Sequence, residues 1–181
     1  SSNAVKIVSE LPQQHILFIP DQNLGRFVAE QVPQKHVILN NGYCPRHHII
    51  TVEQIVDAQE AHPDALVLAH PECKADVLAE ADYIGSTAGI IKYAEESDAS
   101  EFIIVTVRGV LYEFERRCQG TGKKFYFPAV QPTCVNMDLI TLEKLARCLE
   151  TGEGEVQIGV SDEAADQAKI TLDRMLEYAA R

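Results

Sequence analysis

Two of the five cysteines lie where a metal could reach them. Cys44 stands in the loop-like sequence of residues 40–45, and Cys134 ends the similar sequence of residues 131–134. Each follows an apolar run and precedes a helix start, and open α/β sheets bind ligands outside the carboxyl ends of their strands. Thiolates bind zinc and iron–sulfur clusters, but two cysteines are too few for a complete site of either kind.

The other three cysteines are expected to be structural. Cys118 and Cys148 fall inside predicted helices, where a cysteine is most simply a small buried hydrophobe. Cys73 is interpreted as structural or merely close to the site. An odd number of cysteines without a visible export signal indicates reduced thiols and a cytoplasmic protein.

Polar side chains follow a third apolar run, residues 66–69. His70 and Glu72 come directly after it, and in extended geometry side chains two residues apart can face one cleft. The alternative, slightly favoured on these residues alone, is surface polarity or capping of the next helix. His47, three residues after Cys44, is either a second group at the site or a solvated loop histidine.

Two helix starts carry polar side chains. Ser86 and Thr87 follow Gly85, and such a start suits phosphate or carboxylate but is equally an ordinary N-cap. Asp21 and Asn23 follow an earlier apolar run, where they can simply cap the next helix.

Short apolar runs alternate with amphipathic stretches. The runs are rich in β-branched and aromatic residues, as buried strands are, and cover residues 16–19, 37–39, 66–69, 102–107 and 125–127. Predicted helices cover residues 2–10, 23–31, 52–61, 73–81, 87–96, 109–118, 142–150 and 162–180. The alternation predicts parallel βαβ units in a three-layer α/β fold.

An internal repeat relates the two loop cysteines. Each is followed six residues later by Ile-Thr, at residues 50–51 and 140–141. The cysteines are 134 − 44 = 90 residues apart, and Ser1 and Ser86, which open similar helices, are 86 − 1 = 85 apart. Accidental recurrence of α/β patterning is the alternative. If the repeat is threefold and one copy is absent, three thiolates could hold a [4Fe-4S] cluster whose fourth iron is an open Lewis acid.

The overall charge argues against some classes of partner. The 181 residues have a net charge of −11 and a pI of about 4.9, so no surface for nucleic acid or an anionic membrane is expected. No apolar run reaches the ~18 residues of a membrane span, and no signal peptide is visible. A small anion remains possible, because helix-start amides hold phosphate without net positive charge.

Six motifs in order resemble the quinolinate synthase family along essentially the whole chain. They lie at residues 1–5, 20–26, 42–47, 70–73, 85–91 and 134–137. Each is weak alone, whereas six with compatible spacing are specific. The resemblance implies repeated three-layer αβα domains with short parallel sheets, three of them about a pseudo-threefold axis. Each domain would give one cluster cysteine to an active site at their junction.

On this resemblance the chain is the C-terminal two-thirds of such an enzyme. Residues 1–44 would form most of the second domain and residues 45–134 the third. Residues 135–181 would form a helical segment that packs on the third domain or on the absent first one. That absent domain would supply the remaining cluster cysteine and a catalytic tyrosine, so this chain alone is expected to be inactive.

The resemblance also implies a reaction: iminoaspartate condenses with dihydroxyacetone phosphate to quinolinate in NAD biosynthesis, releasing phosphate and water. Cys44 and Cys134 would be ligands of the [4Fe-4S] cluster. Glu72, with His70 beside it, would be the general acid and base. Groups that hold substrate carboxylates and phosphate would be Ser1, His47, His70, Glu72, Ser86 and Thr87. The implied partners are the two substrates and the enzyme that supplies iminoaspartate, with no nucleic acid and no membrane.

Two other functions compete with this interpretation. One is a non-catalytic α/β module that binds a small phosphorylated metabolite at its Ser-Thr helix starts, without a metal. The other is a thiol enzyme with one reactive cysteine, but no histidine stands strongly enough beside a cysteine in the sequence to favour it.

Overall fold

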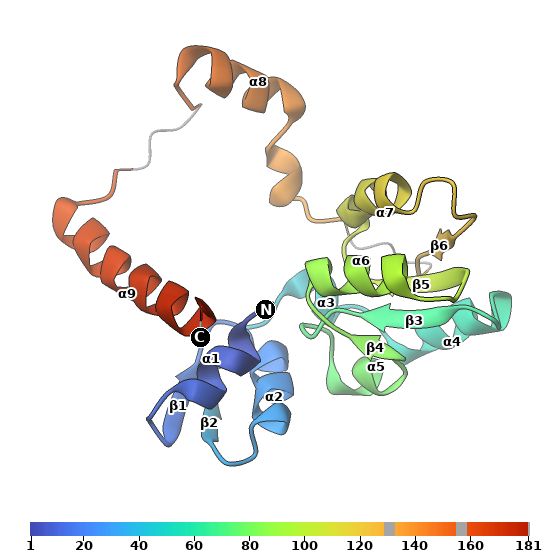
Figure 1. The fold of residues 1–181 in the computed structure, drawn as a ribbon, viewed down its shortest axis with the longest axis horizontal. Coiled ribbons are helices and arrows are strands. Elements are labelled where there is room, and N and C mark those ends of the chain that lie inside the picture. Colours follow the sequence, from blue (N-terminus) through green and yellow to red (C-terminus); the bar gives the residue numbers. More distant parts are fainter. Residues whose placement is uncertain (129–132, 155–158, 181) are drawn as a thin grey trace. The chain divides into compact units, whose positions relative to one another are not determined.

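The structure, a computed structural model, describes residues 1–128, 133–154 and 159–180. It separates into two compact units, Ser1–Thr133 and Cys134–Arg181. Within the described residues, the strands lie in the first unit and form a two-stranded and a four-stranded sheet, both parallel. The predicted α/β class with short parallel sheets is therefore confirmed (Figure 1).

The smaller sheet packs on two helices. Its elements are α1 (Ala4–Glu10), β1 (His15–Phe18), α2 (Gln22–Gln31) and β2 (His36–Leu39). One face of the sheet meets both helices in a core that includes Val8, Leu24 and Val28. Leu17 and Ile38 lie on the opposite face and are exposed. This sheet therefore has one covered and one open apolar face.

The larger sheet has its most buried strands at the centre. Its strands, in spatial order, are β4 (Tyr83–Ile84), β3 (Leu66–Ala69), β5 (Glu101–Val105) and β6 (Lys124–Tyr126). In β3 and β5 every residue after the first is buried. Continuous apolar runs are typical of parallel strands that are covered on both faces, and the sequence predicted both strands on that ground.

Helices cover both faces of the larger sheet. They are α4 (Val52–Ala61), α5 (Ala75–Ala79), α6 (Thr87–Glu96) and α7 (Leu111–Arg117). Val67 and Ile103 pack on the α4–α5 side, whereas Leu68 and Phe102 pack on the α6–α7 side. Figure 1 shows α6 and α7 above the sheet and α4 and α5 below it. This part of the chain is therefore the predicted three-layer sandwich.

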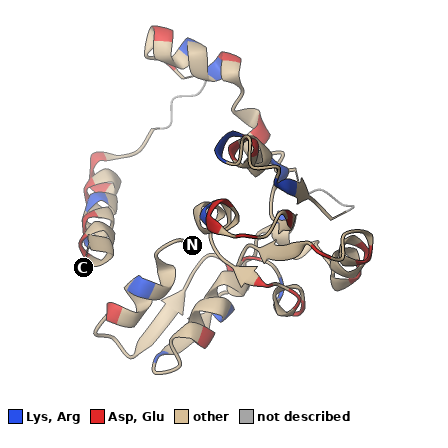
Figure 2. Ribbon diagram, turned by 45° about the vertical axis from the view of Figure 1, so that its right-hand side comes forward, with Lys and Arg blue, Asp and Glu red and all other residues tan. Residues whose placement is uncertain are grey.

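The second unit is helical in its described residues. It contains α8 (Leu142–Thr151) and α9 (Asp162–Ala180). Gly152, in left-handed backbone conformation with φ 71°, ends α8. Figure 2 shows acidic and basic turns interspersed along α9. No helix in the described ranges has the length and apolarity needed to cross a membrane.

Side-chain caps set the predicted helix starts. The Thr51 hydroxyl accepts from the Gln54 amide and the Gln54 side chain accepts from the Thr51 amide, which completes a capping box. Thr141 accepts from the Lys144 amide at the start of α8. The two Ile-Thr motifs therefore start helices in the same way. Superposition of the two halves of the repeat stays a prediction.

In the first unit the sequence did not predict two short elements. One is β4, because two residues cannot show an alternating pattern. The other is α3 (Pro45–His48), a single turn whose first residue is a proline. Proline suits the first position of a helix, where its missing N–H is not needed, but one turn is too short to show periodicity. This missed turn carries part of the candidate site.

Candidate functional site

The loop that carries Cys44 is tied to the start of α2. Asp21 is buried and its carboxylate accepts from two backbone amides, that of Leu24 at 2.8 Å and that of Cys44 at 2.6 Å. A Cβ on Gly42 would lie 2.2 Å from the Pro20 carbonyl oxygen, so the loop needs glycine there. Asp21 therefore caps α2, as expected, and also fixes the cysteine loop, which the sequence did not predict.

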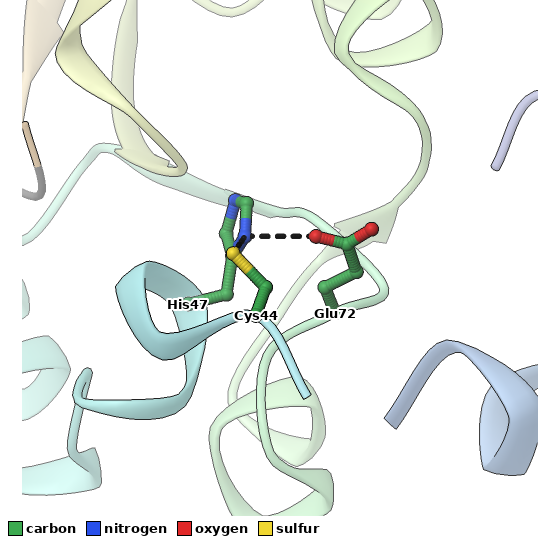
Figure 3. Close-up of side chains that lie close together, drawn as sticks. All are labelled: Cys44, His47 and Glu72. Carbon is green, nitrogen blue, oxygen red and sulfur yellow. Dashed lines mark hydrogen bonds and ion pairs between the residues drawn. The ribbon is translucent and has the colours of Figure 1, made fainter. Parts of the chain in front are cut away.

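His47 is buried and stands between Cys44 and Glu72. Its Nδ1 lies 3.2 Å from Cys44 Sγ and 3.1 Å from Glu72 Oε2 (Figure 3). The three-residue spacing from Cys44 brings the two side chains together on the single turn of α3. The solvated-loop alternative for His47 is therefore wrong. A histidine does contact a cysteine here, which removes the sequence argument against a thiol enzyme.

Thr106 holds the other side of the His47 ring, a contact that sequence reasoning missed. It follows β5 directly, is 1% exposed, and its Oγ1 lies 2.9 Å from His47 Nε2. The signal in the sequence was a single polar residue within the apolar run of residues 102–107. A threonine hydroxyl can donate or accept, so this contact can hold the imidazole in either tautomer.

His70 stacks on His47, with ring centroids 4.5 Å apart. Its Nδ1 accepts from the Glu72 amide at 3.3 Å, and its Nε2 lies 3.4 Å from Ser1 Oγ. Burial, reinforced by His47 and opposed by Glu72, lowers the pKa of His70 to about 4. His70 is therefore a neutral imidazole at physiological pH.

Glu72 lies at the open side of this group of side chains, with a quarter of its own side chain exposed. The hydrogen bond with His47, acting against burial, lowers the pKa of Glu72, so this side chain is a carboxylate at neutral pH. Burial, with Glu72 nearby, raises the pKa of the Cys44 thiol. The three side chains thus place the ionised carboxylate of Glu72 and the protonated thiol of Cys44 on either side of the His47 imidazole.

Asn23 connects α2 to the loop after β3, which is a second contact missed from the sequence. It is buried, and its Nδ2 donates to the Glu72 carbonyl oxygen at 3.0 Å. The same Nδ2 lies 3.2 Å from His48 Nδ1. Capping was the expected role, whereas the structure gives Asn23 the task of positioning the backbone of Glu72.

Ser86 and Thr87 stand at the start of α6. Ser86 Oγ accepts from the Gly89 amide at 3.2 Å, an ordinary N-cap. Among the described residues, no hydrogen bond links either side chain to Cys44, His47 or Glu72. Their predicted role in holding phosphate therefore stays a prediction.

The remaining cysteines divide into a buried and an accessible group. Cys73 is fully buried, its thiol donates to the Val105 carbonyl oxygen, and burial raises its pKa to about 12, as suits a structural thiol. Cys118 is buried, as predicted. Cys148 was predicted to be buried but is exposed, as are the neighbouring described residues of α8, none of which is buried. Cys134 belongs to the second unit, so its approach to Cys44 stays a prediction.

The depressed pKa of His70 predicts acid destabilisation of this chain. The pKa is about 4 in the folded state and about 6.5 when unfolded. The unfolded state therefore binds more protons between these values, and stability is lost as pH falls from about 6.5 to about 4. The expected loss approaches about 3 kcal/mol once the pH lies below both values.

Urea unfolding at pH 7, 5.5 and 4.5 measures this loss. His70→Gln should show a shallower pH dependence than the parent chain. The exposed His36→Gln is the matched control and should leave the dependence unchanged. Equal slopes for His70→Gln and the parent would contradict the assignment.

Comparison with known proteins gives one consistent result. The family model described as quinolinate synthetase A protein (NadA) matches residues 1–177. Proteins named quinolinate synthase from Fusobacterium nucleatum and Caldicellulosiruptor saccharolyticus are each 45% identical over 179 residues. One from Clostridioides difficile is 41% identical over 179 residues. Each alignment covers 99% of this chain and 58% of the relative, so the chain spans a little over half of their length.

Proposed function

Since the chain belongs to the quinolinate synthetase A family, we propose that it forms part of an enzyme that condenses iminoaspartate with dihydroxyacetone phosphate to quinolinate. This reaction would serve NAD biosynthesis in the cytoplasm, with iminoaspartate supplied by another enzyme. One observation carries the proposal beyond the family name. It is the convergence of Cys44, His47 and Glu72 at the strand ends, with His70 stacked beside them.

A [4Fe-4S] cluster fits the thiols that this chain offers. Cys44 is partly exposed on a loop, and a coordinated thiol loses its proton to the metal, so its raised pKa is no obstacle. Cys134 is the second partly exposed cysteine and would be the second ligand. Three thiolates are needed, and we assign the third to a part of the enzyme outside these 181 residues. When bound, the cluster supplies Lewis-acid chemistry toward the hydroxyl that dehydration removes.

The proton transfers are assigned to Glu72 and His47. Glu72 begins as a carboxylate and can accept a proton from substrate during enolisation or imine rearrangement. His47 contacts this carboxylate and is itself held by Thr106, so the pair can keep a transferred proton in place until it is returned. His70, neutral and buried, is suited to hydrogen-bond substrate without competing for a proton.

Binding of the anionic substrate groups is assigned to neutral donors. Ser1 lies within reach of His70, and the start of α6 offers Thr87 and free amides beside Ser86. Hydroxyls and helix-start amides can hold carboxylate or phosphate in a chain with a net charge of −11. The alternative of a non-catalytic phosphate-binding module would leave the Cys44, His47 and Glu72 cluster without a role.

The test compares this 181-residue chain with a full-length enzyme, meaning a polypeptide of the relatives' length that contains these residues. Both are reconstituted anaerobically with iron and sulfide and assayed for quinolinate from iminoaspartate and dihydroxyacetone phosphate. The full-length enzyme should carry one cluster and turn over, whereas the 181-residue chain should do neither. A cluster-loaded full-length enzyme that makes no quinolinate would overturn the function. Full cluster content and turnover in the short chain would overturn the assignment of a third ligand elsewhere.

A further inference from the structure

We propose that Cys44, His47 and Glu72 also form a site for a single divalent cation of the zinc class. The site requires neither the cluster nor the reaction. One sulfur, one imidazole nitrogen and one carboxylate oxygen lie within 4.8 Å of one another. Zinc accepts all three kinds of ligand and commonly keeps a fourth position for water when the protein supplies three. A cluster, by contrast, would draw only on the thiol of this group.

The distances are close to those of a bound ion. His47 Nδ1 lies 3.2 Å from Cys44 Sγ and 3.1 Å from Glu72 Oε2. With bonds of about 2.0–2.3 Å, ligand atoms around a tetrahedral zinc ion lie about 3.3–3.8 Å apart. The two separations from His47 Nδ1 therefore need to lengthen by only a few tenths of an ångström to suit a bound ion.

Each of the three ligands is held by a contact outside the group. Thr106, which is buried, lies against the second ring nitrogen of His47, as the outer partners of metal-bound histidines do. Asp21 accepts from the amide of Cys44, and Asn23 donates to the carbonyl of Glu72. When Nδ1 gives up its hydrogen, Nε2–H can donate to the Thr106 hydroxyl, which leaves the Nδ1 lone pair facing the other two ligands.

Charge favours a dication at this position. The Glu72 carboxylate and the Cys44 thiol, which would lose its proton to a bound metal, converge on one point, and among the described residues no Lys or Arg forms an ion pair with Glu72. A divalent ion would neutralise both groups. Because Cys44 belongs to this site and to the proposed cluster, the two occupants exclude each other. Zinc bound first is therefore expected to block cluster assembly.

The experiment uses the reduced, chelator-treated 181-residue chain without substrate. Co²⁺ is added anaerobically to report a thiolate ligand by its absorption, and Zn²⁺ affinity is measured against a chromophoric chelator. One equivalent should bind. Cys44→Ser should lose the thiolate absorption, Glu72→Gln and His47→Gln should weaken Zn²⁺ binding at least about tenfold, and Thr106→Val should weaken it about 10–100-fold.

Two cysteine variants separate this site from other thiols. Cys148→Ser removes an exposed thiol and should leave the Co²⁺ spectrum unchanged. Cys134→Ser removes a proposed cluster ligand and should also leave it unchanged. Circular dichroism and thermal unfolding of the metal-free variants check that they fold. If a histidine variant unfolds, Glu72→Gln remains informative, because the Glu72 side chain is partly exposed.

Failure to bind Co²⁺ or Zn²⁺, or a thiolate band that survives Cys44→Ser, would overturn the proposal. Loss of the band in Cys148→Ser would reassign the ion to an adventitious surface thiol and would also overturn it. These outcomes are independent of the proposed reaction, because neither substrate nor cluster is present in the measurement.

Discussion

A full-length enzyme with Cys44→Ser is expected to carry no intact [4Fe-4S] cluster and to form no measurable quinolinate. Serine keeps the size of the side chain but replaces a soft thiolate by a hydroxyl that does not ionise near neutral pH. The Cys44 loop should keep its shape, because Asp21 accepts from the backbone amide of residue 44 and not from its side chain. The loss should therefore be one of cluster and activity, with little change in folding.

Cys148→Ser is the matched control for this substitution. Cys148 is also a free cysteine outside the buried core, but it is not a proposed ligand. The control should retain iron, sulfide and turnover, whereas Cys134→Ser should behave like Cys44→Ser. Iron and sulfide content, the visible spectrum and the thermal midpoint are measured on the same preparations. A normal cluster in either ligand variant would remove that residue from the ligand set.

The sequence predicted the framework of this site well. Central strands such as Leu66–Ala69 are continuous apolar runs, and between helices a short run of this kind is typical of a buried parallel strand. Helix starts were predicted equally well, because Thr51 and Thr141 cap through contacts that span only three residues. Both features depend on residues that are close together in the sequence, so a short window of sequence is enough to predict them.

The contacts that make the site specific are not local. His47 meets Thr106 across 59 residues, and Asn23 meets the backbone of Glu72 across 49. Such pairs depend on how two strand ends meet, which periodicity cannot reveal. His47 was left open between a group at the site and a solvated loop histidine, because a single turn such as α3 is too short to show periodicity. The prediction that Cys148 is buried was wrong, because the pattern of a helix does not show whether another element covers its apolar face.

Glu72→Gln in the full-length enzyme is expected to lower kcat by about 10²–10⁴-fold while the cluster and the fold remain. The amide keeps the shape of the side chain and can still accept a hydrogen bond from His47, but it cannot take up a proton. The lowered pKa of Glu72 makes it a weak base alone. Glu72 Oε2 lies 3.1 Å from His47 Nδ1. We therefore expect the two side chains to act together when they exchange protons with substrate.

A structural Glu72 would give a different result. Its removal would lower the thermal midpoint or the iron content and leave turnover per cluster nearly unchanged. The exposed Glu60→Gln on α4 is the matched control, with the same change of chemistry away from the site. Iron content, thermal midpoint and single-turnover quinolinate formation are measured on one preparation of each variant. Normal turnover at normal cluster content would exclude Glu72 as the proton-transfer group. His70, which stacks on His47 and lies within hydrogen-bonding distance of Ser1, would then be the next group to test.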